Sequence, residues 1–516
     1  EPDATRLLQH AAAMESAPAS GTRPTAAFDE ALAMLMRRHE PREPRTSYDA
    51  RQRIVVDRER ARFSTWYEVF PRSTSPDRRT AGDFKTVLGW LPYISEMGFD
   101  VIYFPPIHPI GATHRKGKNN NPAGEAGAPG SPWAIGATEG GHDAINPALG
   151  TLDDFRAVIA GANQRGMEVA LDLALQCSPD HPWVKAHPQW FKHLPNGSIR
   201  YAENPPKRYE DIYPIDFETE DWQALWREID RVVRYWVAQG VRIFRVDNPH
   251  TKAFSFWEWL IAGVKRDYPD VLFLAEAFTR PRTMYRLAKL GFDQSYTYFT
   301  WRTAKWELSE YMTELTQTEV RQFFRPNFWP NTPDILHEYL QTGGRPAFMI
   351  RLLLAATLTA SYGIYGPAFE LCVNTPREWG SEEYLDSEKY EVRHWDLKAP
   401  QSLRYFIARV NQARHAHPAL QRNDGFATLE SNNDQLFAYT KVSADGSDRI
   451  VCIVNLDPSS RQTGWVRLPP SLLGTQPGDA FVLHDLLDDA RYTWRDEWNY
   501  VELDPNVLPA HVLHLE

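Results

Sequence analysis

The sequence predicts a (β/α)8 TIM barrel with an inserted subdomain after the third strand, an N-terminal helical segment and a C-terminal antiparallel β-sandwich. Eight short apolar segments, separated by helical patterns, extend over about 300 residues, as an eight-stranded barrel requires. Two successive segments end in acidic residues, Asp247 and Glu276, and such barrels keep their chemistry at the C-terminal ends of the strands. After about residue 425 short alternating strands replace the helical patterns.

The barrel elements alternate in chain order. The expected strands are 65–71, 99–107, 167–173, the run 241–250 as far as Asp247, 271–276, 293–298, 326–331 and 361–366. Helical patterns lie between most pairs, near 83–97, 151–165, 219–239 and 254–268. Strand, helix and strand in this order make a right-handed crossover, so neighbouring strands should be parallel.

The remaining segments precede, follow or interrupt the barrel in the sequence. We expect three domains: a helical segment at 1–60, the barrel at 61–424 and the β-sandwich at 425–516. An Ala/Leu/Met stripe from Ala26 to Met36 has helical spacing and is best explained by packing. Two connections, 108–150 and 177–218, are too long for simple barrel loops and should form lids or small subdomains.

Composition excludes several classes of function. The 516 residues carry a net charge of −10, which gives no basic surface for nucleic acid. No apolar run is long enough to span a membrane, and no signal peptide is recognised at the start. Three widely spaced cysteines match neither a disulfide framework nor a zinc site, so reducing cytoplasm is the expected compartment. The 18 Trp and 22 Tyr suit a sugar site, although this link is compositional.

The acidic strand ends admit a structural and a functional explanation. One acidic residue after an apolar strand is usually a turn former or a helix N-cap. Two on successive strands, V-R-I-F-R-V-D-N-P-H at 241–250 and V-L-F-L-A-E at 271–276, favour a site. Arg245 and Asp247 lie on the same face of their strand, since side chains alternate with period two. The arginine can therefore keep Asp247 ionised, as a nucleophile requires.

Four strand-end motifs carry a resemblance to a known superfamily. L-D-L-A-L-Q-C, F-R-V-D-N-P-H, F-L-A-E-A-F and F-W-P-N-T-P-D resemble the motifs of the α-amylase clan, glycoside hydrolase family 13. The resemblance implies that Asp247 is the nucleophile, Glu276 the general acid/base and Asp334 a carboxylate that orients sugar hydroxyls. It implies that Arg245 supports the nucleophile and that Asp172 is the structural acidic residue of the first motif.

The residue types suit this chemistry in their own right. A retaining glycosyl transfer needs one carboxylate that attacks the anomeric carbon and one carboxylic acid that assists the leaving group, about 5–5.5 Å apart. Glu276 follows an apolar strand, so loss of solvent can raise its pKa. The mechanism requires no metal and no cofactor, and we expect none.

Departures from the clan narrow the expected family. Most α-amylases have Asn-His where this sequence has Gln176-Cys177, and His-Asp where it has Pro333-Asp334. Longer stretches instead resemble the maltosyltransferases of bacterial glycogen synthesis: P-P-I-H-P-I-G, R-K-G-K-N-N, A-L-Q-C-S-P-D-H-P-W, A-E-N-P-P-K-R-Y-E-D-I-Y-P-I, D-N-P-H-T-K and E-Y-L-D-S-E-K-Y. This resemblance implies α-maltose 1-phosphate as donor and an α-1,4-glucan or maltooligosaccharide as acceptor, extended at its non-reducing end by a double-displacement reaction that releases phosphate.

The same resemblance implies a set of binding residues. The donor phosphate would be held by Asn204, Lys207 and Tyr209, whose amide, cation and phenol suit a dianion. Taken without the resemblance, this loop would more readily be a solvated one that packs on the barrel. Contacts to the donor sugar are expected from Lys116, Gln176, Arg245 and Asn248. Lys389 and Tyr390 would contact the second glucose, with a surface helix as an equal alternative, and His142 is expected to pack a loop.

Two other classes of function remain open. A hydrolase or a trehalose-forming isomerase of the clan would use the same carboxylates on α-glucosides without phosphate. A glucan-binding relative without activity is less expected, because all three carboxylates are present. The maltosyltransferase family carries a β-rich domain ahead of its helical segment, whereas this sequence opens in the helical segment. A homodimer is therefore expected only if its interface does not need that domain.

Overall fold

The computed structural model describes residues 2–15, 29–40, 54–122, 124–125, 127–204, 207–469 and 479–516, without the side chains of Asn204 and Lys207. The chain divides into two compact units, Glu1–Val56 and Asp57–Glu516. The first holds α1 (Pro2–Glu15) and α2 (Glu30–His39), where Asp3 of α1 pairs with Arg38 and His39 of α2. Residues 26–28 of the predicted apolar stripe lie outside the described part, and Leu32 and Leu35 of α2 are buried.

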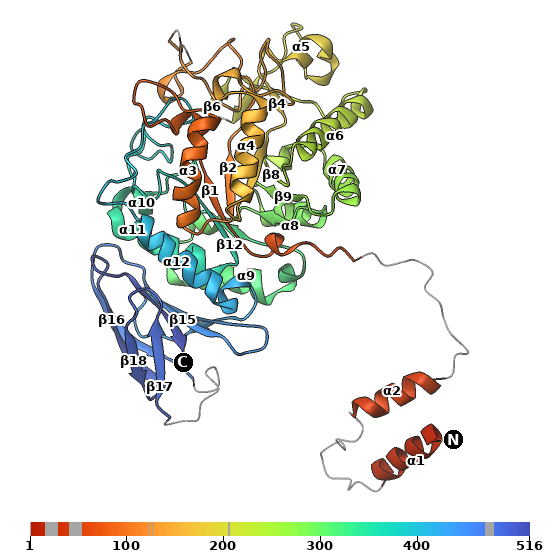
Figure 1. The fold of residues 1–516 in the computed structure, drawn as a ribbon, viewed down its shortest axis with the longest axis vertical. Helices are drawn as coiled ribbons and strands as arrows, with labels where there is room; N and C mark the ends of the chain where they lie inside the picture. Colours follow the sequence, from red (N-terminus) through yellow and green to blue (C-terminus); the bar gives the residue numbers. More distant parts are fainter. Residues whose placement is uncertain are drawn as a thin grey trace. The chain divides into compact units, whose positions relative to one another are not determined.

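The second unit contains the predicted barrel (Figure 1). Among the described residues, eight parallel strands form one sheet in the order β10-β9-β8-β3-β2-β1-β12-β11, and a bridge between Ser295 and Pro326 joins its two edges. All eight expected strands are present: β1 (Ser64–Glu68), β2 (Val101–Phe104), β3 (Glu168–Leu173), β8 (Ile243–Val246), β9 (Leu272–Ala275), β10 (Gln294–Ser295), β11 (Asn327–Phe328) and β12 (Ser361–Tyr365). The predicted fold class is thus confirmed.

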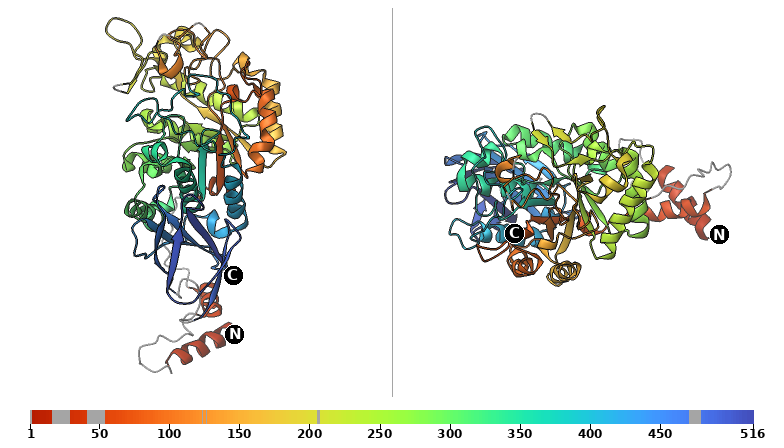
Figure 2. Two further views of the ribbon diagram at one scale, coloured as in Figure 1. Left: turned by 90° about the vertical axis from the view of Figure 1, so that its left-hand side faces the viewer. Right: turned by 90° about the horizontal axis from the view of Figure 1, so that it is seen from above.

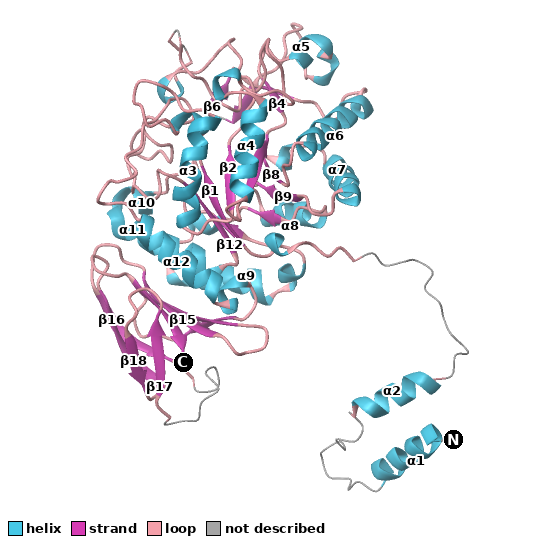
Figure 3. Ribbon diagram, in the orientation of Figure 1, coloured by secondary structure: helices cyan, strands magenta, loops and turns pink. Residues whose placement is uncertain are grey.

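Alternation along the strands separates two parts of the core. Trp66, Tyr103, Ile243 and Trp329 belong to a cluster inside the barrel, whereas Tyr67, the neighbour of Trp66, packs in the larger cluster under the helices. Helices cover the outside of the strands, as the cyan and magenta colouring of Figure 3 shows. They are α3 (Phe84–Glu96), α4 (Leu152–Asn163), α6 (Trp222–Ala238), α7 (Phe254–Asp267), α8 (Pro281–Lys289), α9 (Lys305–Gln317), α10 (Glu338–Thr342), α11 (Gly344–Leu358) and α12 (Arg404–Ala416).

The predicted helix starts have a local cause. Asp83 and Thr86 form a capping box at α3, and Thr151 and Asp154 form another at α4. Single 3₁₀ turns connect other elements: η2 (Glu59–Ala61), η3 (Pro71–Ser73), η4 (Lys118–Asn120), η5 (Pro147–Leu149), η6 (Pro188–Trp190), η7 (Pro249–Thr251), η8 (Tyr298–Trp301), η9 (Glu319–Gln322) and η10 (Pro418–Gln421). In the described part of the chain, no helix combines the length and apolarity needed to cross a membrane.

The two long connections fold against each other beyond the C-terminal ends of the strands. The second contains β4 (Gln176–Cys177), α5 (Pro182–Ala186), β5 (Ala202–Asn204), β6 (Lys207–Tyr209) and β7 (Tyr213–Pro214), with β4 paired to β7 and β5 to β6. Asp180 accepts hydrogen bonds from the backbone amides of Ala112 and Thr113, each at 2.7 Å, and Lys116 pairs with Glu210. These contacts join the insertions into one cover over the barrel.

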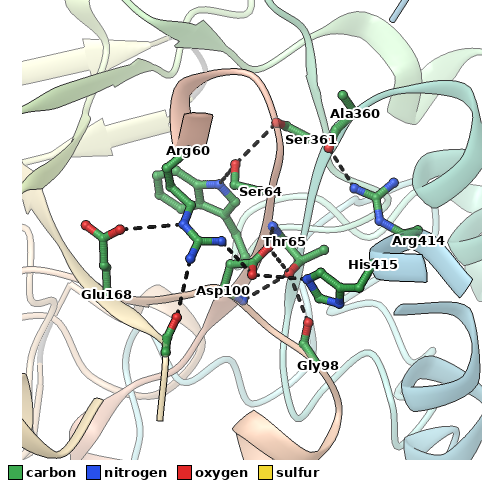
Figure 4. A network of polar contacts seen from close by, with 12 residues as sticks. Arg60, Ser64, Thr65, Gly98, Asp100, Glu168, Ala360, Ser361, Arg414 and His415 are labelled. Atoms are coloured by element: carbon green, nitrogen blue, oxygen red, sulfur yellow. Dashed lines mark hydrogen bonds and ion pairs between the residues drawn. The ribbon is translucent and has the colours of Figure 1, made fainter. Parts of the chain in front are cut away.

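The opposite end of the barrel is held by a polar network (Figure 4). The Asp100 carboxylate accepts from the amide and hydroxyl of Thr65 at 2.9 and 2.8 Å and pairs with Arg60 at 2.5 Å and His415 at 3.2 Å. Arg60 also lies 3.5 Å from Glu168 at the start of β3. The network ties the N-terminal ends of three strands to α12, so this face serves stability.

The C-terminal region forms two packed sheets. One has the order β13-β14-β15-β20-β17-β18, and β16 pairs with β19 in the other. Val466, Val501 and Leu503 of the small sheet share an apolar cluster with residues of the large one, which confirms the predicted sandwich. The strands are β13 (Phe426–Leu429), β14 (Leu436–Val442), β15 (Arg449–Asn455), β16 (Gln462–Arg467), β17 (Phe481–Asp485), β18 (Arg491–Trp494), β19 (Trp498–Leu503) and β20 (Ala510–Leu515).

Two buried cations gather at the end of α11, and one of them, Lys441, links the sandwich to the barrel. Arg414 of α12 donates to the carbonyls of Ala356, Thr359 and Ala360 at the end of α11, and Lys441 of β14 donates to Leu358 O at 3.2 Å. The last carbonyls of a helix have no partner within the helix, so these donors cap the end of α11. The sandwich lies next to α11 and α12 in Figure 1 and in the left view of Figure 2. Because residues 57–516 form one compact unit, the division at residue 425 stays a proposal.

Candidate active site

Asp247 and Glu276 directly follow two neighbouring strands, β8 and β9. The amide of Asp247 donates to Leu173 O at 3.2 Å, and the amide of Glu276 donates to Val246 O at 3.0 Å. The strand ladder therefore continues one residue past each strand. This places both carboxylates at the C-terminal end of the barrel with a fixed backbone.

Arg245 connects the acidic side chains. Its Nη1 donates to Asp247 Oδ1 at 2.8 Å and to Asp172 Oδ2 at 3.0 Å, and its Nη2 lies 3.4 Å from Glu276 Oε1. Burial lowers the pKa of Arg245, but the surrounding acidic groups, Asp172 first, raise it well above its usual value. The guanidinium is thus a permanent positive charge between three buried carboxyl groups.

Asp172 orients Arg245 through their hydrogen bond and is itself held by two aromatic side chains. Its Oδ2 also accepts from the hydroxyl of Tyr103 at 2.6 Å and from the indole nitrogen of Trp133 at 3.2 Å. Sequence reasoning missed both aromatic residues. The signal for Tyr103 was its position two residues after Val101 in a buried strand, since both face the barrel interior. Trp133 lies in the first insertion, where no periodicity points to it.

The surroundings of Glu276 favour its protonated form. Burial raises its pKa to about 7, with a further upward contribution from the charge of Asp247, while Arg245 and the Asn248 amide oppose the shift. That amide donates to Glu276 Oε2 at 3.1 Å, and Asn248 Nδ2 donates to Asp247 Oδ2 at 3.3 Å. Asn248 has φ 44°, a left-handed conformation uncommon outside glycine. This conformation lets one residue contact both carboxylates.

Asp334 lies farther out, in the segment that follows β11. Its charge raises the pKa of Glu276, yet half of its side chain is exposed, and Oδ1 accepts from Lys389 Nζ at 2.7 Å. Lys389 Nζ also lies 5.1 Å from the centre of the Trp133 ring. Lys389 and Tyr390 are mostly buried and non-helical, so the surface-helix alternative does not apply. They line a small pocket with Asn119, Pro333, Asp334, Arg377, Glu383, Tyr384 and Ser387.

The other expected binding residues lie in the insertions or, for Gln176, immediately before the second one. Lys116 is buried and paired with Glu210, and Gln176 donates to Trp133 O at 3.4 Å. Tyr209 is partly buried and close enough to Lys389 to influence its pKa. The side chains of Asn204 and Lys207 lie outside the described structure. Their backbones face each other in the β5–β6 pair.

His142 packs inside the first insertion. Its Nε2 lies 2.9 Å from Ala174 O, its Nδ1 lies 3.0 Å from His181 Nε2, and its ring stacks on Trp183. Burial lowers its pKa to about 4, so it is neutral. These contacts give His142 a structural place behind Gln176 and Cys177.

The chain is similar to known proteins along most of its length. A family model described as "Alpha amylase, catalytic domain" matches residues 68–223, and one described as "GLGE, C-terminal" matches 428–515. An alpha-1,4-glucan:maltose-1-phosphate maltosyltransferase of Chlorobaculum tepidum is 53% identical over 98% of this chain and 77% of its own. One of Methylacidiphilum infernorum is 55% identical over 90% of this chain and 69% of its own.

Solved structures resemble the fold at low sequence identity. An alpha-amylase from Geobacillus thermoleovorans gives a TM-score of 0.67 at 18% identity, covering 88% of this chain and 98% of that one. An alpha-amylase from Lactobacillus plantarum gives 0.65 at 20% identity, covering 89% and 100%. At this identity the likeness concerns the fold alone.

The raised pKa of Glu276 predicts a pH-dependent cost in stability. Because the unfolded chain releases this proton near pH 4.5 and the folded chain near pH 7, the contribution of Glu276 to stability falls as pH rises between these values. The Glu276→Gln variant carries no titrating group at this position. The difference between its unfolding free energy and that of the wild type should therefore increase, in favour of the variant, by about 2–3 kcal/mol from about pH 5 to about pH 8. Urea unfolding at both pH values measures this, with Glu310→Gln on the surface of α9 as control. A difference that does not change with pH would contradict the assignment.

Proposed function

The chain belongs to the family of alpha-1,4-glucan:maltose-1-phosphate maltosyltransferases, and we propose that it moves a maltosyl unit from α-maltose 1-phosphate to the non-reducing end of an α-1,4-glucan. The observation that carries the mechanism is the pair of carboxyl groups on one guanidinium, Asp247 and Glu276, in different environments. Such a pair supplies the nucleophile and the acid/base of a retaining transfer.

In the first half-reaction Asp247 attacks the anomeric carbon of the donor. Arg245 and Asn248 donate to its oxygens and leave it available as a carboxylate. The bond to the phosphate oxygen breaks, and the proton held by Glu276 assists the departing phosphate. The product of this step is a β-maltosyl ester of Asp247 together with inorganic phosphate.

In the second half-reaction Glu276, now ionised, takes the proton from the 4-hydroxyl of the acceptor glucan. The hydroxyl oxygen attacks the anomeric carbon, the ester bond to Asp247 breaks, and an α-1,4 linkage forms. Two inversions restore the α configuration. The acceptor grows by two glucose units, and Glu276 is protonated again for the next cycle.

The phosphate of the donor is assigned to the β5–β6 pair. Asn204 and Lys207 are directly opposite each other across the two strands, and Tyr209 follows Lys207 at the same-face spacing of two. An amide, an ammonium and a phenol therefore share one ribbon, which suits a phosphate dianion. Lys116 and Gln176 are proposed to contact the donor sugar from the neighbouring insertion segments.

The second glucose is assigned to the pocket beside Asp334. The ion pair with Asp334 holds Lys389 over the ring of Trp133. When the donor binds, its hydroxyl groups can replace Asp334 as the partners of Lys389. Tyr390 lines the same pocket. Asp334 is proposed to orient hydroxyl groups of the sugar next to the scissile bond.

We also propose where the enzyme is located, in the cytoplasm, and how it assembles. Cys177, Cys372 and Cys452 are unpaired, which is typical of proteins from reducing cytoplasm. We also propose a homodimer, which the mass of the enzyme in solution would test.

The direct test is phosphate release from α-maltose 1-phosphate with and without maltooligosaccharide. We expect acceptor-dependent release and products longer by two glucose units. A clan hydrolase or a trehalose-forming isomerase would instead turn over starch or trehalose without phosphate. Activity on those substrates with no phosphate release from the donor would contradict the proposal.

An exposed tryptophan is proposed to bind the acceptor. Arg377 N donates to Glu383 O at 2.7 Å, and their side chains pair at 2.5 Å, which closes a loop beside the pocket. Trp379 lies in this loop with 90% of its surface exposed. Such a residue is costly to leave in water, and its flat face can cover the apolar face of a glucose unit.

Trp379→Ala should raise the KM for the glucan acceptor about five- to tenfold, equivalent to roughly 1 kcal/mol of lost contact. The KM for the donor should not change, because the phosphate and second-glucose sites are intact. Trp306→Ala is the control, because Trp306 at the start of α9 is also an exposed tryptophan, with 67% of its surface accessible. Equal effects of both substitutions, or a change in donor KM alone, would exclude Trp379 as an acceptor contact.

A further inference from the structure

Three side chains of types that can ligate a metal meet outside the candidate active site, where the sandwich joins the barrel. His417 lies between α12 and η10, Asp448 immediately precedes β15, and His514 belongs to β20. His417 Nδ1 is 3.0 Å from Asp448 Oδ1, and His514 Nε2 is 3.5 Å from the same oxygen. The proposed mechanism uses none of them.

The spacing fits a small divalent cation. Bonds of about 2.0–2.1 Å in tetrahedral geometry place neighbouring ligand atoms roughly 3.3 Å apart. The two measured separations lie on either side of this value, and all three ligand atoms lie within 4.8 Å of one another. Two imidazoles and one carboxylate are a donor set suited to Zn²⁺ and its neighbours, with one position left for water.

Hydrogen bonds orient the Asp448 carboxylate, and the two histidines stay partly accessible to solvent. Asp448 Oδ2 accepts from the Ala419 amide at 2.8 Å, and the Asp448 amide donates to Ser443 Oγ at 2.9 Å. Outer contacts of this kind orient metal ligands. The side chains of His417 and His514 are 16% and 27% exposed, so an ion can enter without unfolding.

A second cluster, His142, Cys177 and His181, shows what excludes a metal. The Trp183 amide donates to His181 Nδ1 at 3.0 Å, which places the proton of the neutral ring on Nε2. That Nε2–H donates to His142 Nδ1, and His142 Nε2–H donates to Ala174 O. Every ring nitrogen is therefore used, and all three side chains are fully buried.

We propose that His417, Asp448 and His514 bind one divalent transition metal ion, of which Zn²⁺ is the expected representative. The ion would connect the segment after α12 to the paired strands β15 and β20, which already meet at Ile450 and His514. Its role is structural, at the joint between barrel and sandwich. This departs from the absence of metal expected from the sequence.

The test uses the full-length, untagged, chelator-treated enzyme with Co²⁺ as the spectroscopic probe and Zn²⁺ as competitor. We expect one equivalent of Co²⁺ to give the visible absorption of a low-symmetry site, displaced by Zn²⁺, and Zn²⁺ to raise the thermal midpoint. His514→Ala and His417→Gln should each weaken binding at least tenfold. Their transferase activity, which depends on the distant carboxylates, reports that they fold.

His484→Ala is the matched control. His484 is the cross-strand partner of His514 but contacts Asp489 at 3.2 Å and is not part of the set. It should bind Co²⁺ as wild type does. Absence of stoichiometric binding in wild type, or equal weakening by His484→Ala, would overturn the proposal and leave only adventitious binding by surface histidines.

Discussion

The candidate active site depends on one buried cation, the guanidinium of Arg245. Three carboxyl groups converge on it, and without it their mutual repulsion and loss of solvent would be uncompensated. The arrangement is asymmetric. Asp247 receives a short hydrogen bond from the guanidinium, whereas Glu276 has only a longer contact at 3.4 Å and a pKa raised to about 7. Burial and the unequal contacts with Arg245 thus give two neighbouring carboxyl groups different environments.

The candidate site and the network that stabilises the strands lie at opposite ends of the barrel. Asp172 and Arg245 lie near the C-terminal ends of β3 and β8, and Asp247 and Glu276 directly follow β8 and β9. At the other end Asp100 gathers Arg60, Thr65 and His415, so the N-terminal ends cannot spread (Figure 4). Burying charge in the site costs stability, whereas the ion pairs and hydrogen bonds of Asp100 stabilise the opposite end of the barrel.

Periodicity and motif spacing predicted the eight strands, the sandwich and the placement of the reacting carboxyl groups at strand ends, because these features follow from local pattern. Other contacts could not be predicted. Trp133 reaches Asp172 across 39 residues, and Lys389 reaches Asp334 across 55. The left-handed backbone of Asn248 has no sequence signal beyond the tolerance of asparagine for it. His417, Asp448 and His514 come together only when the sandwich packs on α12.

The central claim is that Glu276 acts on the leaving group while Asp247 forms the covalent bond, and intact-protein mass spectrometry of Glu276→Ala tests it most directly. Phosphate needs less help to depart than a sugar hydroxyl needs to attack, so the first step should proceed and the second should stall. Incubation with α-maltose 1-phosphate should therefore add the mass of one maltosyl group, mapped to Asp247. A Glu276→Ala protein that folds and binds donor but gains no mass would contradict this division of roles.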